Sequence, residues 1–360
     1  MIIQNRTCGS NPPNKLMLEI TDIPTEGYES VKRAVDTTTG LHAIISVHST
    51  VLGPALGGMR LWAYETEGDA IFDVLRLSKG MTYKAACAGL DLGGGKSVIV
   101  GDPAAKTDDL FKSMGEFVES FGGNYITAED VNTKVEDMAA VNSKTQHVVG
   151  LAGKSGNPSP YTAWGCFIGL RACMEEAYGS SDITDKVIAI EGAGSVGSAY
   201  AKLIADAGGK VVVADIFDES AQKVAAATGG IVVSPDAIRS VECDVYAPCA
   251  LGGSINDETI PGFKSRIVCG AANNQLLEDR HGKALKEAGI LYGPDYVVNA
   301  GGLINVYNEL GPEGYEEQRA LGMMDKIYDN LKEMFAISKE EGICVARAAD
   351  RFGERRIETV

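Results

Sequence analysis

The chain contains, at residues 186–215, the stretch KVIAIEGAGSVGSAYAKLIADAGGKVVVAD, which decides the fold of its C-terminal half. An apolar strand pattern leads into the spacing Gly192, Gly194 and Gly197; an amphipathic helical pattern follows, and a second apolar strand ends at Asp215. In such a unit the first glycine permits a tight turn, the second lets the backbone approach a pyrophosphate, and the third lets the helix pack closely on the strand. The helix N-terminus favours the negative phosphates. The segment therefore predicts a dinucleotide-binding site.

The acid that ends this segment indicates which dinucleotide is bound. Asp215 follows Gly192 by 23 residues, close to the spacing of about 20 at which an acid binds the ribose hydroxyls. Its charge would repel a 2′-phosphate, and no arginine follows in IFDES, so the predicted cofactor is NAD rather than NADP. A glycine-bearing turn that binds nothing is the alternative. The cofactor contacts expected within this segment are Gly192, Ala193, Gly194, Ser195, Val196, Gly197, Asp215 and Ile216.

The rest of the chain indicates two α/β domains, as its 360 residues exceed what one hydrophobic core usually serves. In the C-terminal half, helical patterns separate short apolar strands, which predicts a doubly wound parallel sheet. Those strands are expected at 186–190, 211–215, 231–233, 244–247, 266–269 and 290–292. The first 150 residues mix strand patterns with helical patterns, the latter at 67–80 and 108–121. Residues 1–17 lack periodicity and are predicted to form a flexible N-terminal extension.

Composition and charge exclude several classes of protein. The net charge is −16, and no lysine- and arginine-rich run interrupts it, so neither nucleic acid nor an anionic membrane is an expected partner. The apolar runs are far shorter than the roughly 20 residues that cross a bilayer, and residues 1–17 lack a signal-peptide core, which predicts a cytoplasmic protein. The eight cysteines form no C-x-x-C pair. Reduced thiols and no metal site are expected.

Two lysines form the candidate catalytic centre. The segment MTYKAACAGLDLGGGKSVIV (81–100) places Lys84 at the end of a helical pattern and Lys96 after three glycines, just before a strand. Most lysines are solvated surface charges, which is the alternative interpretation. Here the neighbours are apolar or glycine, and three glycines in a row are costly in entropy unless something approaches the backbone closely. A desolvated lysine beside another cation is able to act as a general base near neutral pH.

With these segments, the chain from about Tyr28 to the C-terminus resembles the glutamate, leucine, phenylalanine and valine dehydrogenase superfamily, above all its leucine, valine and phenylalanine dehydrogenases. The resemblance implies NAD-dependent, reversible oxidative deamination of an L-amino acid to a 2-oxo acid, ammonium and NADH. It also implies a mixed-sheet substrate domain and a Rossmann domain with the active-site cleft between them. The motifs that carry it are LGPALGGMR (52–60), MTYKAACAGLDLGGGK (81–96), YITAEDVNT (125–133), SGNPSPYTAWG (155–165), GAGSVG (192–197), YAPCALGG (246–253), GAANNQL (270–276) and PDYVVNAGGLINV (294–306).

The resemblance gives roles to individual residues. Lys84 is expected to hold the substrate carboxylate, Lys96 to activate water as general base, and Asp130 to handle the substrate amino group and its protons; for Asp130 a helix N-cap is the alternative. Further substrate contacts are expected at Leu56, Gly57, Gly58, Ala128, Asn274, Asn299, Leu303 and Val306. Further cofactor neighbours are expected at Arg60, Thr162, Cys249, Ala250 and Asn273, although Cys249 also fits a buried thiol. No histidine matches a catalytic position.

The resemblance further implies a discontinuous first domain, made of residues 18–149 and 330–360, with the NAD domain at 150–329, and a homo-oligomer. Leucine, isoleucine and valine are the substrates predicted, because the expected pocket is apolar; members that act on glutamate carry a lysine and a serine where this chain has Leu56 and Val306. Asn132, Leu303 and Tyr307 depart from the leucine and valine pattern, and some members acting on phenylalanine or tryptophan carry asparagine or leucine at such places. A phenylalanine or aromatic amino-acid dehydrogenase is therefore the alternative.

Two alternative functions, from other classes of protein, fit the sequence less well. A non-catalytic NAD-binding regulatory protein would be expected to lose a lysine or the aspartate, and all three are present. A hydroxy-acid dehydrogenase would normally use a histidine base.

Overall fold

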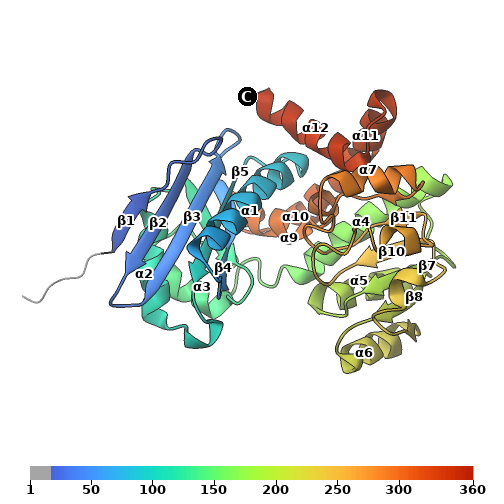
Figure 1. Ribbon diagram of the computed structural model, residues 1–360, viewed down its shortest axis with the longest axis horizontal. Helices are drawn as coiled ribbons and strands as arrows, with labels where there is room; N and C mark the ends of the chain where they lie inside the picture. Colours follow the sequence, from blue (N-terminus) through green and yellow to red (C-terminus); the bar gives the residue numbers. More distant parts are fainter. Residues whose placement is uncertain (1–17, 360) are drawn as a thin grey trace, which may run out of the picture.

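The computed structural model describes residues 18–359, so the predicted extension over residues 1–17 lies outside the described residues. Two six-stranded sheets, each covered by helices, form two domains that lie side by side (Figure 1). The α/β class with two domains, predicted from the sequence, is confirmed. Within residues 18–359, no helix is long and apolar enough to span a membrane.

The first domain has a mixed sheet in the order β1-β2-β3-β5-β4-β6. β5 is antiparallel to β3 and parallel to β4, and β4 is parallel to β6. Helix α1 covers one face of the sheet and α2 covers the other, so alternate residues of β3, such as Ile44 and Ile45, enter different core clusters. The elements are β1 (Glu19–Asp22), β2 (Ser30–Asp36), β3 (Leu41–Ser49), β4 (Ala55–Trp62), α1 (Glu67–Cys87), β5 (Gly93–Val100), η1 (Pro103–Ala105), α2 (Asp108–Glu119), β6 (Tyr125–Glu129) and α3 (Val135–Asn142).

The second domain has an all-parallel sheet in the order β12-β11-β10-β7-β8-β9. The chain turns from one side of the sheet to the other at β7, and ligands of such sheets bind outside the carboxyl ends of the strands at that switch point. Its elements are α4 (Ser159–Tyr178), β7 (Val187–Glu191), α5 (Ser195–Asp206), β8 (Lys210–Ala214), α6 (Asp218–Thr228), β9 (Ile231–Val232), η2 (Ile238–Ser240), β10 (Val245–Pro248), η3 (Ile260–Gly262), β11 (Ile267–Val268), α7 (Arg280–Glu287), β12 (Leu291–Tyr292), α8 (Asp295–Val298), α9 (Gly301–Tyr307), η4 (Asn308–Leu310) and α10 (Glu317–Met324).

The C-terminal helices contact both domains. α11 (Lys326–Glu341) packs against α4, whereas α12 (Val345–Glu358) packs against α11 and α1. Arg356 of α12 donates to the Leu90 carbonyl at 2.6 Å and to Asp91 Oδ1 at 2.8 Å, and Asn330 Nδ2 donates to the Cys87 carbonyl at 2.8 Å. The bonds to Leu90 and Cys87 satisfy backbone carbonyl groups at and just beyond the C-terminus of α1, which have no partner inside the helix. The domain boundaries that the resemblance implied stay a prediction, because this segment touches both domains.

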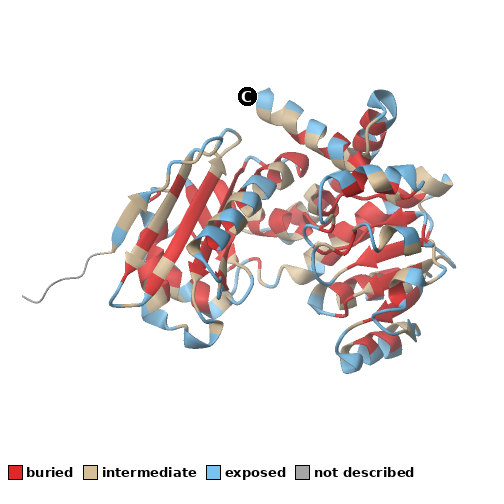
Figure 2. Cartoon of the chain, viewed as in Figure 1, coloured by how far each residue is buried: buried red, intermediate tan, exposed pale blue. Residues whose placement is uncertain are grey.

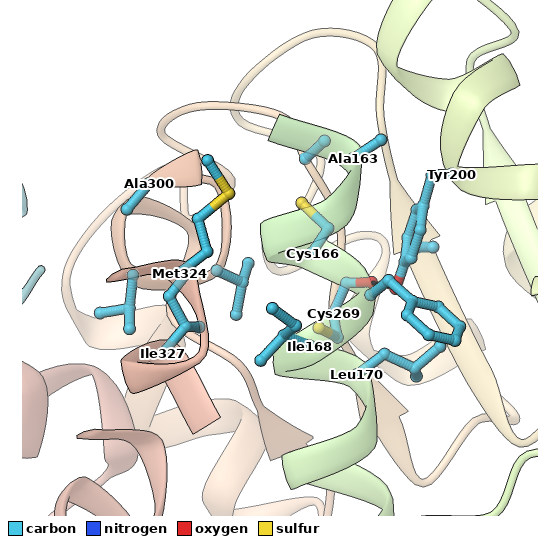
Figure 3. Close-up of a cluster of buried hydrophobic side chains, with 14 of the residues drawn as sticks. Ala163, Cys166, Ile168, Leu170, Tyr200, Cys269, Ala300, Met324 and Ile327 are labelled. Carbon is cyan, nitrogen blue, oxygen red and sulfur yellow. Dashed lines mark hydrogen bonds between the residues drawn. The ribbon is translucent and has the colours of Figure 1, made fainter. Parts of the chain in front are cut away.

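The largest core surrounds α4, the helix at the centre of the second domain. Figure 2 shows buried residues along the inner strands of both sheets, and Figure 3 shows side chains from α4, α5, α10 and α11 packed together. Gly165 and Gly169 of α4 face α8: an added Cβ would lie 2.9 Å from the Val298 carbonyl oxygen and 2.6 Å from Val298 Cγ1, respectively. Because glycine allows this approach, α8 and α9 rest directly on α4 and project residues towards the first domain.

Candidate active site

A cavity of about 550 Å³ is lined by residues of both domains. α1, β4, β5 and the end of β6 contribute from the first domain, and α8, α9 and the start of α5 contribute from the second. The site residues expected from the sequence that line it are Leu56, Gly58, Arg60, Lys84, Lys96, Ala128, Asp130, Thr162, Val196, Asn273, Asn274, Asn299, Leu303 and Val306. One cavity thus collects side chains from segments that are far apart in the sequence.

Glycines bring the two lysines into this cavity. A Cβ at Gly94 would lie 2.2 Å from the Thr82 backbone nitrogen, and a Cβ at Gly95 would lie 2.6 Å from the Tyr125 ring. Only glycine permits these contacts, so α1 lies directly on the start of β5. The helix predicted at 67–80 in fact continues to Cys87, which places Lys84 in its last turn. The three glycines begin β5 rather than precede it, so Lys96 lies within the strand.

Lys96 and Asp130 form a buried ion pair. Lys96 is only 7% exposed, and its Nζ donates to Asp130 Oδ2. Arg60 Nε lies 3.9 Å from the same oxygen. Burial disfavours the charge of Asp130, but Lys96 and Arg60 outweigh burial and lower the pKa of its carboxyl group. Asp130 is therefore an ionised carboxylate. It is not a helix N-cap, because α3 has Lys134 at that position.

Lys84 reaches from the first domain to the second. Its Nζ donates to Asn299 Oδ1 at 2.7 Å, and Asn299 Nδ2 in turn donates to Asn273 Oδ1 at 2.8 Å and to the Ala271 carbonyl at 3.1 Å. Burial lowers the pKa of Lys84 to about 8, and the charge of Asp295 acts in the opposite direction. The ammonium group is thus held at the junction of the domains.

The remaining wall of the cavity is aliphatic. Leu56, Ala128, Leu303 and Val306 are all buried and belong to one hydrophobic cluster. They come from β4, β6 and α9, so both domains form the pocket. An apolar side chain placed here would contact only aliphatic groups at these four positions, whereas a charged one would lose its hydration without gaining a partner from them.

The glycine-rich turn of the second domain fits a dinucleotide. Gly192 has φ +109°, and a Cβ at Gly197 would lie 2.0 Å from the Gly192 carbonyl oxygen, so both positions require glycine. Gly194 is the N-cap of α5; the space around it is open, and no side chain of the described residues caps the helix. The N–H groups at the start of α5 are thus accessible to phosphate oxygens.

Asp215 closes the other side of this turn. Its Oδ2 accepts from the Ala193 N–H at 2.7 Å, and its Oδ1 accepts from the Phe217 N–H at 2.8 Å. The carboxylate is therefore fixed at the carboxyl end of β8, next to Ile216, whose side chain is largely exposed. Cys249 and Ala250 follow β10 and pass next to Gly192, whose added Cβ would lie 2.8 Å from Ala250 N. Burial raises the pKa of Cys249 to about 12, so its sulfur is a thiol.

Gly57 does not line the cavity, although sequence reasoning expected it to contact substrate. An added Cβ would lie 1.7 Å from the Gly95 carbonyl oxygen, and the Gly57 carbonyl accepts from Tyr125 Oη at 2.7 Å. Glycine is therefore required at this position for the packing of β4 on β5. Gly58, by contrast, lines the cavity, and an added Cβ would lie 2.8 Å from Asp130 Cβ.

Several residues of the site were missed by sequence reasoning. Leu77 and Met81 line the cavity and lie two turns and one turn, respectively, before Lys84 on α1, so the helical period predicts that they share its face. Asp295 and Tyr296 also line it; they lie in the quoted motif PDYVVNAGG, but a single acid in an apolar motif gives no periodic signal.

Two of the three departures from the leucine and valine pattern lie away from the cavity. Asn132 has φ +60°, and its amide donates to the Leu61 carbonyl at 3.0 Å, so it stabilises a turn in a conformation that favours asparagine or glycine. Among the described residues, Leu303 lines the cavity and Tyr307 does not. Only Leu303 therefore bears directly on the choice of substrate.

Comparisons with known proteins agree with this architecture. Residues 26–147 match the family model described as Glu/Leu/Phe/Val dehydrogenase, dimerisation domain, and residues 214–357 match Glutamate/Leucine/Phenylalanine/Valine dehydrogenase. The chain is 49% identical to a leucine dehydrogenase of Bacillus cereus over 334 residues, which covers 92% of this chain and 91% of that protein. The chain belongs to the Glu/Leu/Phe/Val dehydrogenase family.

Members of this family that act on aromatic amino acids are also similar. An L-tryptophan dehydrogenase of Nostoc punctiforme is 43% identical, with 95% of this chain and 96% of that protein covered. The crystal structure of L-tryptophan dehydrogenase from that organism superposes with a TM-score of 0.82 at 42% identity, covering 92% of this chain and 96% of that one. A phenylalanine dehydrogenase of Caldalkalibacillus thermarum is 46% identical, with 92% and 91% covered. The protein is thus an amino-acid dehydrogenase of a pyridine-nucleotide-dependent family.

Proposed function

We propose that the protein catalyses the NAD-dependent, reversible oxidative deamination of hydrophobic L-amino acids to 2-oxo acids, ammonium and NADH, with leucine, isoleucine and valine as its best substrates. The observation that carries this proposal is that one cavity joins two lysine amino groups and a carboxylate, those of Lys84, Lys96 and Asp130, to an aliphatic wall. The three polar groups suit an amino acid's carboxylate and amino group, and the aliphatic wall suits its side chain.

Each side chain of the site has a separate role in the proposed reaction. The Lys84 ammonium binds the substrate carboxylate, and Asn299 keeps that ammonium in place through its hydrogen bond of 2.7 Å. Asp130 accepts a proton from the substrate ammonium, which leaves a neutral amine. A nicotinamide held by the second domain would supply one reaction when bound, the acceptance of a hydride from the substrate Cα. Water then attacks the resulting iminium ion of the substrate. Lys96 acts as a neutral amine, its own proton having been released to solvent, and removes a proton from that water.

The contact between Lys96 and Asp130 makes these proton transfers direct. Because Lys96 Nζ donates to Asp130 Oδ2, a proton passes between them without a bridging water. Loss of ammonia from the carbinolamine needs a proton on the leaving nitrogen, and Asp130 returns the one that it took from the substrate; the Asp130 carboxylate so formed then accepts the carbinol O–H proton as the carbonyl group forms. The pair thus serves both the early deprotonation and the late protonation.

Residues of the second domain support NAD as the preferred cofactor. Gly192, Gly194 and Gly197 leave room for the pyrophosphate at the start of α5. The Asp215 carboxylate is held by two N–H groups at the end of β8, where it suits ribose hydroxyls and repels a 2′-phosphate. Thr162, Asn273 and Val196 line the cavity on the same side and are the proposed neighbours of the nicotinamide half.

Assembly and location belong to the same proposal. A homo-oligomer is supported by the match of residues 26–147 to a domain described as a dimerisation domain. A cytoplasmic enzyme would suit a substrate and a cofactor that are both metabolites.

Aromatic amino acids are the second candidate substrates, for the same mechanism. Leu303 at the cavity wall supports them, since it departs from the leucine and valine dehydrogenase pattern, and a tryptophan dehydrogenase and a phenylalanine dehydrogenase are 43% and 46% identical to this chain. An apolar pocket separates substrates by only about 1–3 kcal/mol per methylene, so overlapping activities are expected.

A substrate series tests the proposal. We expect kcat/KM, measured by NADH formation, to be highest for leucine, isoleucine and valine, with measurable turnover of phenylalanine. A preference of about tenfold or more for phenylalanine or tryptophan would overturn the branched-chain assignment and leave the mechanism intact.

A further inference from the structure

A buried carboxylate, Asp295, shares the cavity with Lys84 and takes no part in the proposed chemical steps. It is the first residue of α8 and is only 7% exposed. Its Oδ2 accepts from the Gln275 N–H at 2.9 Å, and its Oδ1 accepts from the Tyr296 N–H at 2.7 Å. Both oxygens therefore act as acceptors, and these bonds and the charge of Lys84 favour the ionised carboxylate, whereas burial raises the pKa of the Asp295 carboxyl group.

Asp295 lies one helical turn before Asn299, the residue that binds the Lys84 ammonium. Residues four apart in a helical turn lie on the same side, and Asp295 and Asn299 both line the cavity that Lys84 lines from the first domain. Burial disfavours the ammonium form of Lys84, and the nearby negative charge of Asp295 favours it.

The other groups that act on Lys84 are Lys96, Asp130 and the thiol of Cys166. Lys96 and Asp130 are paired with each other, so their opposite charges largely cancel at Lys84. Burial keeps Cys166 as a neutral thiol by raising its pKa. Asp295 is left as the main negative charge that offsets the burial of the substrate lysine.

We propose that Asp295 is a positioning residue of the amino-acid site, whose charge keeps Lys84 protonated so that Lys84 binds the substrate carboxylate above neutral pH. This inference rests on the proposed function, in which Lys84 binds that carboxylate. Asp295 also fixes the backbone at Gln275, next to Asn274, a cavity residue with φ +51°. It thereby connects the charge of the site with the loop that forms one of its walls.

The test is the pH dependence of binding of 4-methylpentanoate, which is leucine without its amino group, to the NADH complex of Asp295→Asn. This probe is ionised at every pH from about 6 to about 10, so the loss of affinity at high pH reports the loss of the Lys84 charge. Because a neighbouring opposite charge changes a pKa by about one unit or more, we expect the affinity to start falling about one pH unit lower than in the wild type. Once the pH is high enough for the affinity of both proteins to be falling, the Asp295→Asn variant then binds 4-methylpentanoate about tenfold more weakly than the wild type.

Two further variants separate a charge effect from a structural one. Asp350→Asn is the matched control. Asp350 is a partly buried carboxylate that accepts from Tyr296 Oη at 2.9 Å but does not line the cavity. Its replacement should not change the pH at which the affinity for 4-methylpentanoate begins to fall. Lys84→Arg carries a guanidinium that stays protonated. On that background we expect Asp295→Asn to produce no pH-dependent loss.

An equal loss of affinity at every pH, or a loss of thermal stability alone, would overturn the proposal. If Asp295→Asn does not fold, Asp295→Ser gives the same test, since water can then accept from the two N–H groups. A wild-type protein that neither binds 4-methylpentanoate nor oxidises leucine would contradict the proposed function instead, so the two failures are distinguishable.

Discussion

Replacing Lys96 with alanine removes the proposed general base. Lys96 is 7% exposed in the middle of the first domain's sheet, and its only ionic partner among the described residues is Asp130. General-base catalysis contributes ~10²–10⁴-fold to the rate, which corresponds to about 2.7–5.4 kcal/mol of activation free energy. We expect kcat for leucine in Lys96→Ala to fall by this factor, whereas NADH binding, followed by its fluorescence, stays close to that of the wild type because the glycine-rich turn belongs to the other domain.

Lys106→Ala is the matched control for Lys96→Ala. Lys106 also belongs to the first domain and pairs with an aspartate, with Nζ 2.6 Å from Asp137 Oδ2, but it does not line the cavity. The control should keep its kcat while it loses a comparable ion pair. Thermal unfolding of both variants shows whether the Lys96 variant is folded. A folded Lys96→Ala enzyme with a near wild-type kcat at neutral pH would refute the assignment of the base.

Three other perturbations give distinct outcomes. Glutamate should be turned over at least about 100-fold less efficiently than leucine, because burying its carboxylate beside Leu56 and Val306 costs several kcal/mol; comparable kcat/KM values would contradict this. Lys84→Ala should mainly raise KM, and in the wild type KM for leucine should rise as the pH passes about 8, because the lowered pKa of Lys84 means that its ammonium is lost there; a KM that stays flat to about pH 10 would exclude that role. Asp215→Ser combined with Ile216→Arg should shift the preference from NAD towards NADP, and an unchanged ratio of the two kcat/KM values would place the ribose contact elsewhere.

The sequence predicts those parts of the site that are encoded by one contiguous segment of the chain. The turn at Gly192 and the helix α5 are encoded by one contiguous strand, turn and helix, so their geometry follows from glycine spacing alone. The lysines at 84 and 96 stood out because glycines separate them from charged neighbours, and the structure shows why: Gly94 and Gly95 admit α1 and Tyr125 at contact distance.

The strand order, the position of Asp295 and the placement of the C-terminal helices depend on contacts between segments far apart in the sequence. No pattern within a single segment predicts such contacts. β5 lies between β3 and β4, a strand order that hydrophobic periodicity does not determine. Asp295 reaches the site because Gly165 and Gly169 let α8 rest on α4, and that contact is visible only when both segments are placed together. The division of the C-terminal helices between two domains depends on contacts such as that of Arg356 with Leu90, 266 residues apart in the sequence.

The most direct test of oxidative deamination is the stoichiometry of the products formed from L-leucine and NAD. The proposed roles of Lys84, Lys96 and Asp130 predict that NADH, ammonium and 4-methyl-2-oxopentanoate appear in equal amounts, and that the 2-hydroxy analogue of leucine yields no NADH. Formation of NADH from the hydroxy acid without release of ammonium, or failure of every L-amino acid to yield NADH while the dinucleotide binds, would contradict oxidative deamination by this protein.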